Sequence, residues 1–194
     1  MARPLTIGLT GGIAAGKSEA LAALGRLGAA TISSDAIAHE LLDSEPLRGR
    51  IAERWGTEVV AGGVVDRDRV GEIVFARPEE LAWLEGQIHP LVGERIAAWL
   101  AELPAGTEFA AIEVPLLFES GMDGVFDATI AVSASEDVRR ERAQARGHAL
   151  VGEREARQLP QEEKTARADH VVVNDGSVED LQGELSALLA RLHT

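Results

Sequence analysis

The segment GGIAAGKS, from Gly11 to Ser18, carries residues whose types and spacing suit the binding of phosphate groups. The glycines let the backbone curl so that successive amide N–H groups point at phosphate oxygens. Lys17 supplies a compact positive charge, and a helix that begins there turns its positive end to the same place. The Ser18 hydroxyl can bind Mg²⁺. The pattern G-x-x-x-x-G-K-S (Walker A) is complete, so we expect a phosphate loop rather than an ordinary glycine-rich turn.

Lysine is rare in this chain, which makes its position informative. Among the 19 basic residues only Lys17 and Lys164 are lysines, and the rest are arginines. The planar fork of arginine would fit a tight phosphate loop poorly, which accounts for Lys17. For Lys164, in the segment EEKTA, the sequence assigns no role beyond pairing with a nearby acid.

Two acidic residues that follow predicted strands are candidates for proton transfer or metal binding. Asp35 comes just after the predicted strand 30–33, and we expect it at the same edge of a parallel sheet as the phosphate loop. A carboxylate there can accept a proton from a hydroxyl that attacks a γ-phosphate, and can help to hold Mg²⁺. The competing role is to cap the next helix, which Ser33 and Ser34 could do equally well. Glu113 ends another predicted strand and is either a magnesium-orienting acid or a plain strand end.

Three further residues have both a functional and a structural interpretation. Arg142 and Arg146 lie four residues apart and share one face of a charged helix. They could grip ATP phosphates when a lid closes, or they could lie on a solvated helix beside acidic neighbours. His89, which precedes Pro90 in LEGQIHPLV, is most simply a hydrogen-bonded histidine at a helix break.

The pattern of apolar residues predicts five strands with helices between them. The expected strands are 5–10, 30–33, 109–114, 128–133 and 170–174, and the expected helices are 17–27, 35–42, 136–146 and 178–192. This alternation predicts an α/β fold with a mostly parallel sheet. Residues 46–103 show helical patterns without clear strands, with a turn at Gly62-Gly63 and breaks at Pro78 and Pro90, and they indicate an inserted helical module.

Composition narrows the classes of function. A chain of 194 residues suits one domain, or one core with inserted modules. A net charge of −13 argues against nonspecific attraction to nucleic acid. The chain contains no cysteine, which excludes disulfides and a thiol nucleophile. The sequence has neither an apolar run long enough to span a bilayer nor a signal-peptide pattern, so we expect a cytoplasmic protein without a membrane partner.

Among phosphate-loop proteins, these features favour a small kinase. The N-K-x-D motif with which GTPases bind guanine is absent, and so is the signature of ABC-type ATPases. A nucleoside monophosphate kinase stays an alternative, although its acceptor is a phosphate and needs arginines more than a base such as Asp35. A non-catalytic nucleotide switch is the other alternative, which the intact Lys17 and Ser18 disfavour.

Together these segments resemble the dephospho-CoA kinase family along almost the whole chain. The matching segments are IGLTGGIAAGKS, ISSDAIAHELL, VVDRDRVGEIVF, LEGQIHPLV, VPLLFES, and RAQARG followed by RQLPQEEKTARADHVVVNDGS. The phosphate loop marks only the superfamily, whereas VPLLFE, HP and the last segment in this order are more specific. The resemblance implies a parallel five-stranded sheet of the P-loop kinase type, flanked by helices, with a helical substrate module and a lid. It also implies phosphorylation of the ribose 3′-hydroxyl of dephospho-CoA, with ATP and Mg²⁺ as cofactors.

The resemblance assigns roles to individual residues. The residues that it places around ATP are Gly11, Gly12, Ile13, Ala14, Ala15, Gly16, Lys17, Ser18, Glu19, Arg142, Arg146, Asn174 and Gly176, with Ser18 on the metal. The residues that it places at the acceptor are Asp35, as general base, and His89, Leu116, Leu117 and Glu119. Lys17 and Arg142 would act in the transfer itself. This chain has Ser33 where the family often has another acid, and Ala14-Ala15 where Gly-Ser is common, a change that leaves the backbone donors in place.

The implied organisation is one kinase domain over residues 1–194 with a small-molecule substrate and no nucleic-acid partner. Its core would comprise residues 1–45, 105–140 and 168–194, its helical substrate module about residues 46–104, and its lid about residues 141–165. The sequence leaves the oligomeric state open.

Overall fold

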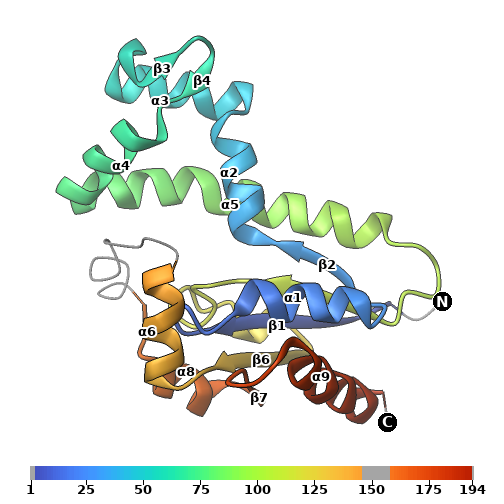
Figure 1. Cartoon of the computed structure of the whole chain (residues 1–194). Helices are drawn as coiled ribbons and strands as arrows, with labels where there is room; N and C mark the ends of the chain where they lie inside the picture. Colours follow the sequence, from blue (N-terminus) through green and yellow to red (C-terminus); the bar gives the residue numbers. More distant parts are fainter. Residues whose placement is uncertain (1–2, 146–157, 194) are drawn as a thin grey trace. The chain divides into compact units, whose positions relative to one another are not determined.

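A computed structural model of the chain describes residues 3–145 and 158–193. The chain divides into two compact units, one built on a sheet and one built of helices (Figure 1). The sheet unit comprises Met1–Ser33 and Leu103–Thr194, and the helical unit comprises Ser34–Glu102. The helical unit begins at Ser34, and the helical module expected from the sequence, about residues 46–104, covers most of it.

The sheet unit is built on five parallel strands, as the sequence predicts. They are β1 Leu5–Gly11, β2 Ala30–Ser33, β5 Phe109–Glu113, β6 Ala128–Ser133 and β7 His170–Val173. The spatial order is β2-β5-β1-β6-β7, so β1 lies at the centre with β5 and β6 on its two sides. In this order the carboxyl ends of all the strands lie at one edge of the sheet, and β1 leads there directly into the glycine-rich segment.

Helices complete the sheet unit. They are α1 Lys17–Arg26, the 3₁₀ turn η2 Asp123–Val125, α6 Glu136–Ala145, α8 Gln161–Arg167 and α9 Val178–Leu192. α1 and α9 lie side by side against one face of the sheet (Figure 1), where Leu24 and Leu185 are fully buried with Ile7 and Ile130. Burying a leucine or isoleucine side chain stabilises a fold by about 1.5–3 kcal/mol, so this cluster holds the unit together.

The helical unit consists of short elements around one long helix. They are α2 Ser34–Leu42, α3 Glu45–Trp55, the 3₁₀ turn η1 Thr57–Val59, β3 Val60–Ala61, β4 Val64–Val65, α4 Arg67–Ala76 and α5 Pro78–Glu102. Both α2 and α4 pack against α5. The expected turn at Gly62-Gly63 joins β3 and β4 into an antiparallel hairpin, and both glycines have the positive φ that such a turn needs. With two residues in each strand, the hairpin is too short to give an alternating pattern in the sequence.

The predicted helix break at Pro90 is wrong, because α5 runs without interruption from Pro78 to Glu102. A proline inside a helix removes one backbone hydrogen bond and costs about 3 kcal/mol. Leu84 before the proline and Ile96 after it are both buried. Packing on both sides of Pro90 therefore outweighs the local cost, which periodicity alone does not reveal.

A buried acid organises the side chains between α3 and α5. Glu80 accepts hydrogen bonds from Arg54 Nε and from Trp55 Nε1, each at 2.8 Å. The ring of Trp55 meets that of Trp83 edge to face at 5.1 Å between centroids, and the Arg54 guanidinium lies over Trp83. The Glu80 carboxylate therefore holds the side chains of Arg54 and Trp55 in place, and both of these contact Trp83.

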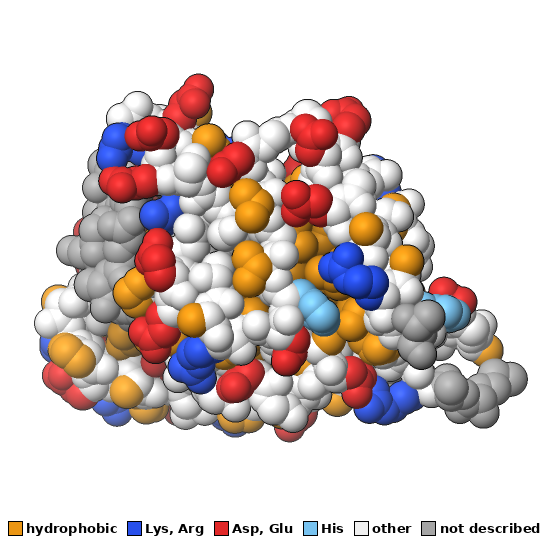
Figure 2. Space-filling view, turned by 90° about the horizontal axis from the view of Figure 1, so that it is seen from below, with side chains coloured by type: hydrophobic (Ala, Val, Ile, Leu, Met, Phe, Trp, Pro, Cys, Tyr) orange, Lys and Arg blue, Asp and Glu red, His pale blue; other side chains and the backbone are white. Residues whose placement is uncertain are grey.

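The surface is strongly acidic. Acidic side chains are spread across the face that Figure 2 shows, in keeping with the net charge of −13. No helix in the described part of the chain is both long enough and apolar enough to cross a membrane.

The Glu80 cluster predicts how the helical unit responds to acid. Hydrogen bonds from Arg54 and then from Trp55 hold the pKa of Glu80 below its ordinary value, against the opposing effect of burial. A carboxylate with a lowered folded pKa stabilises the fold above its unfolded value of about 4.3, and this contribution is lost as the pH falls through the folded pKa. Glu80→Gln should therefore melt with a weaker dependence on pH than the wild type between about pH 5 and pH 3.

Tryptophan fluorescence reports the unfolding of the helical unit at each pH, because all three tryptophans of the sequence lie in this unit. Glu79→Gln is the matched control, since Glu79 is the exposed neighbour of Glu80. If Glu80→Gln and Glu79→Gln lose stability in parallel with the wild type on acidification, the cluster does not have the assigned effect.

Candidate functional site

The phosphate loop follows β1, and two of its glycines allow the backbone an approach that no side chain would permit. Gly11 has φ +153°, and a Cβ there would overlap the carbonyl oxygen of Val132 in β6. Gly16 has φ +96°, and a Cβ there would overlap Nδ2 of Asn174. The loop therefore lies tightly against the carboxyl ends of β6 and β7, and this approach requires glycine at both positions.

Asn174, which directly follows β7, holds the loop from one side. Its side chain is buried, and Nδ2 donates to the carbonyl oxygen of Ala15 at 2.8 Å. Its own backbone N–H donates to the carbonyl oxygen of Ser133 at 2.7 Å. The resemblance places Asn174 around ATP, and the contact observed for its side chain is with the phosphate loop.

Arg142 of α6 reaches the same point. Its guanidinium donates to the carbonyl oxygen of Ala15 at 3.4 Å and to Oδ1 of Asn174 at 3.5 Å. The start of α6 is fixed by Asp175, whose Oδ1 accepts the backbone N–H of Ser135 at 2.6 Å. Asn174 and Asp175 thus link the loop to α6, and Arg142 lies where it can bind a ligand of the loop. Arg146, the other candidate arginine, lies outside the described residues.

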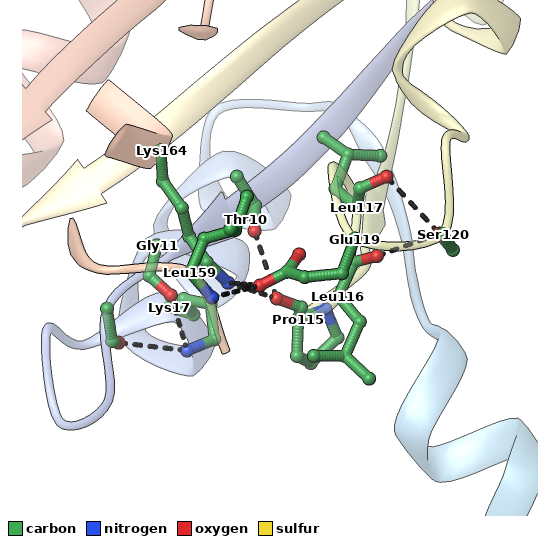
Figure 3. Close-up of polar contacts among 11 residues, drawn as sticks. Thr10, Gly11, Lys17, Pro115, Leu116, Leu117, Glu119, Ser120, Leu159 and Lys164 are labelled. Carbon is green, nitrogen blue, oxygen red and sulfur yellow. Dashed lines mark hydrogen bonds and ion pairs between the residues drawn. The ribbon is translucent and has the colours of Figure 1, made fainter. Parts of the chain in front are cut away.

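The ammonium group of Lys17 lies against the loop backbone, with Nζ 3.2 Å from the carbonyl oxygen of Gly11 and 3.0 Å from that of Gly12 (Figure 3). α1 begins at Lys17, and its N-cap residue Gly16 offers no side chain to the first-turn N–H groups. Ser18 is exposed in this turn, and Glu19 forms an ion pair with Arg26 at 2.9 Å. The positive end of the helix and the lysine are therefore both directed to the loop.

Ala14 is strained. Its φ is +59°, in the left-handed region, and it is the non-glycine residue with positive φ in the described part of the chain. This conformation costs an L-residue about 1–2 kcal/mol relative to the right-handed one. Alanine at position 14, where the family often has glycine, therefore adds this conformational cost to the loop.

Gln161, which the sequence analysis does not single out, supports the loop from α8. Its amide forms a pair of hydrogen bonds with the backbone of Ala134, with Oε1 accepting at 3.1 Å and Nε2 donating at 3.0 Å. A Cβ on Gly12 would lie 2.9 Å from Gln161 Oε1, so this glycine also packs closely. α8 has only seven residues and too little periodicity to be predicted, and the matching segment RQLPQEEK is the one sign of it in the sequence.

Two predicted acceptor residues belong to the helical unit. Asp35 lies in the first turn of α2, two residues beyond the end of β2. Because α2 begins at Ser34, Asp35 lies within the first turn of this helix. His89 is exposed on the continuous helix α5, so it does not lie at a helix break.

The remaining candidates follow β5. Glu113 is buried at the end of this strand, opposite Leu9 of β1 and Ser33 of β2. Leu117 is fully buried, which suits a supporting role, whereas Leu116 is partly exposed. Glu119 forms an ion pair with Lys164 at 3.0 Å.

Gly176 lies in the turn between β7 and α9. A Cβ there would lie 2.7 Å from Oδ2 of Asp180. Asp180 in turn forms a reciprocal cap with Ser177 at the start of α9. The observed neighbour of Gly176 is therefore this helix cap.

Ala14→Gly should relieve the strain in the loop. Glycine adopts φ +59° at no steric cost, so we expect a free energy of unfolding of the sheet unit that is higher by about 1 kcal/mol. Thermal unfolding followed by circular dichroism measures this. Ala22→Gly, on the exposed side of α1, is the control and should be destabilising by roughly the same amount, because glycine costs about 1 kcal/mol inside a helix. If both changes are equally destabilising, Ala14 is not strained in solution.

The sequence and the fold both match known kinases. The sequence model of the dephospho-CoA kinase family matches residues 5–180. A dephospho-CoA kinase of Anaeromyxobacter dehalogenans is 42% identical over 96% of this chain and 91% of its own length. One from Thermosynechococcus vestitus is 38% identical over 99% of this chain and 97% of its own length.

Solved structures agree. A crystal structure of a Thermus thermophilus protein, 38% identical, superposes with a TM-score of 0.84 over 98% of this chain and 99% of its own. The dephospho-CoA kinase of Campylobacter jejuni, 27% identical, gives 0.71 over 96% of each chain. A shikimate kinase of Bacteroides thetaiotaomicron, 18% identical with a TM-score of 0.51, shares the fold. The phosphate-loop sequence, the parallel sheet that presents it and these matches lead to one conclusion: the chain belongs to the dephospho-CoA kinase family.

Proposed function

We propose that this protein transfers the γ-phosphoryl group of ATP to the ribose 3′-hydroxyl of dephospho-CoA, which gives coenzyme A and ADP. Besides family membership, one structural observation supports this proposal. The backbone of the Walker A loop is held against Asn174, with the side chains of Lys17 and Arg142 brought to it. These are the components that phosphoryl transfer needs around the phosphates of ATP.

The loop is suited to hold the β- and γ-phosphates. The uncapped N–H groups at the start of α1 are donors for phosphate oxygens, and the helix adds its positive end. The Lys17 ammonium donates to two carbonyl oxygens of the loop, and it can exchange them for phosphate oxygens with little movement. Arg142 can stabilise the charge that develops on the transferring group, because its guanidinium is already beside Ala15.

Mg²⁺ fits the same site. Ser18 follows Lys17 directly and is exposed, so its hydroxyl can bind a metal ion that also binds the nucleotide phosphates and waters. The buried carboxylate of Glu113 ends the strand next to β1 and is a candidate to orient the waters around that ion. The ion would neutralise charge on the phosphates when bound.

Asp35 is the proposed general base. It lies two residues beyond β2, whose carboxyl end belongs to the same edge of the sheet as the phosphate loop. In the reaction, the acceptor oxygen forms a bond to the γ-phosphorus as the bond to the β–γ bridging oxygen breaks. The acceptor proton passes to the Asp35 carboxylate, and ADP leaves with the bridging oxygen.

An acceptor panel tests the proposal. ADP release is measured with ATP, Mg²⁺ and either dephospho-CoA or one of several nucleoside monophosphates as the only acceptor. We expect turnover with dephospho-CoA alone. Turnover with a nucleoside monophosphate and none with dephospho-CoA would replace the proposed function by a nucleoside monophosphate kinase, and ATP binding without any turnover would indicate a nucleotide switch.

The same assay separates the roles of Asp35. An amide cannot accept the proton, so Asp35→Asn should lower kcat by about 10²–10⁴-fold. It should melt like the wild type and still bind ATP, because Asp35 is exposed and outside the phosphate loop. Glu40→Gln, at an exposed position near the other end of α2, is the control for loss of an acid and should leave kcat unchanged. Wild-type kcat in Asp35→Asn would reject Asp35 as the base and make Glu113 the next candidate.

A further inference from the structure

Lys164, the second lysine of the chain, is fully buried. Its side chain is 0% exposed on α8, and Nζ donates to the carbonyl oxygen of Pro115 at 2.6 Å. Nζ also forms an ion pair with Oε1 of Glu119 at 3.0 Å (Figure 3). A buried ammonium carries a large desolvation cost, which a protein tolerates only where the charge is paired and hydrogen-bonded.

The ion pair connects three segments that are distant in the sequence. Glu119 Oε1 also accepts the backbone N–H of Leu159, just before α8, at 2.8 Å. The carbonyl oxygen of Pro115 accepts a second hydrogen bond, from Thr10 Oγ1 at 3.2 Å. Pro115 to Glu119 form the turn after β5, and Thr10 lies in β1 immediately before Gly11. One charged pair therefore ties α8, this turn and the entry to the phosphate loop together (Figure 3).

The two lysines act on adjacent residues. Lys164 reaches Thr10 through the shared carbonyl oxygen of Pro115, and Lys17 donates to the carbonyl oxygen of Gly11. A shift of the turn after β5 would therefore displace Thr10, which precedes the phosphate loop. This turn contains Leu116, which is partly exposed, and Leu117, which is fully buried.

We propose that Lys164 and Glu119 are positioning residues for the phosphoryl transfer: their buried ion pair fixes the turn from Pro115 to Glu119 against the end of β1. The inference rests on the proposed function. A misplacement of about 1 Å between the parts of an active site can cost about a hundredfold in rate, so an anchor of this kind affects the chemical step without touching the reactants.

Losing one partner of the ion pair between Lys164 and Glu119 should be costly, because the other partner would remain as an unpaired buried charge. Glu119 Oε2 is buried and has no hydrogen-bond partner in the described part of the chain, and Lys164 is the cation with which Oε1 forms its ion pair. Removing the cation alone leaves a buried carboxylate unpaired, whereas removing both charges does not. Glutamine at position 119 can still accept the Leu159 N–H, because it keeps an oxygen at the end of a side chain of the same length.

The test compares Lys164→Met, Glu119→Gln and the double variant in steady-state kinetics, at a temperature well below the melting point of each. For Lys164→Met we expect kcat to fall by about 10- to 100-fold, with the KM for ATP within about threefold of wild type, because the loop keeps its hydrogen bond with Asn174. The double variant should recover at least about fivefold of the lost kcat. Arg140→Met is the control for loss of a cation, since Arg140 forms exposed ion pairs with Glu136 and Asp137, and it should keep wild-type kcat.

A purely structural role would lower the melting temperature of Lys164→Met but leave kcat at wild-type level while the protein is folded, and that result would overturn the inference. So would a double variant that is no better than Lys164→Met. Should Lys164→Met fail to fold, Glu119→Gln decides through hydrogen exchange, because it breaks the same ion pair. Exchange at Thr10 and Gly11 should then quicken, and unchanged exchange at both residues would overturn the inference.

A second readout keeps the inference separate from the proposed function. Amide hydrogen exchange in the unliganded protein should quicken in Lys164→Met at Leu159, and also at Thr10 and Gly11, because the anchor reaches the end of β1. If the wild type turns over no dephospho-CoA, the proposed function fails on its own. Unchanged exchange at Thr10 and Gly11 would reject the anchor, whatever the activity.

Discussion

The structure of the sheet unit depends on one close approach, that of the phosphate-loop backbone to the carboxyl ends of β6 and β7. Gly11 lies against the Val132 carbonyl and Gly16 against the Asn174 amide, with no room for a side chain at either position. The approach places the Ala15 carbonyl within reach of both Asn174 and Arg142. A loop held in this way keeps its N–H groups in place before a ligand arrives, and such preorganisation lowers the cost of binding.

The phosphate site is locally positive, although the protein as a whole carries a large negative charge. With a net charge of −13, the long-range field disfavours ATP, so the site has to supply its own positive potential. Lys17, Arg142 and the start of α1 do this over a few ångströms, where screening by salt has little effect. Several other arginines of the sheet unit are paired with carboxylates, such as Arg26 with Glu19 and Arg140 with Glu136, which leaves the potential concentrated at the loop.

Much of this arrangement can be predicted from the sequence, because it depends on local patterns. The five strands, α1 and α9 match their predicted ranges to within a residue or two, and the Walker A spacing identifies the phosphate loop. Residues whose partners are distant in the chain give no such signal. Lys164 is paired with Glu119 across 45 positions, and Asn174 meets Ala15 across 159, so no spacing rule could bring them together. The helix through Pro90 escapes prediction for a related reason, since its packing within the helical unit decides the outcome rather than the proline itself.

Calorimetric titration of Gly16→Ala with ATP and Mg²⁺ tests whether the close approach at Gly16 shapes the site that binds ATP. Gly28→Ala is the matched control, because its φ of +94° is almost the same as the +96° of Gly16, while a Cβ there would meet nothing within 4 Å. Both variants place alanine at nearly the same positive φ, but only Gly16→Ala drives a methyl group into Asn174. We expect Gly16→Ala to weaken ATP binding by at least about tenfold, which is about 1.4 kcal/mol, and Gly28→Ala to bind like the wild type. Equal affinities in the two variants would show that the close approach of Gly16 to Asn174 does not shape the ATP site.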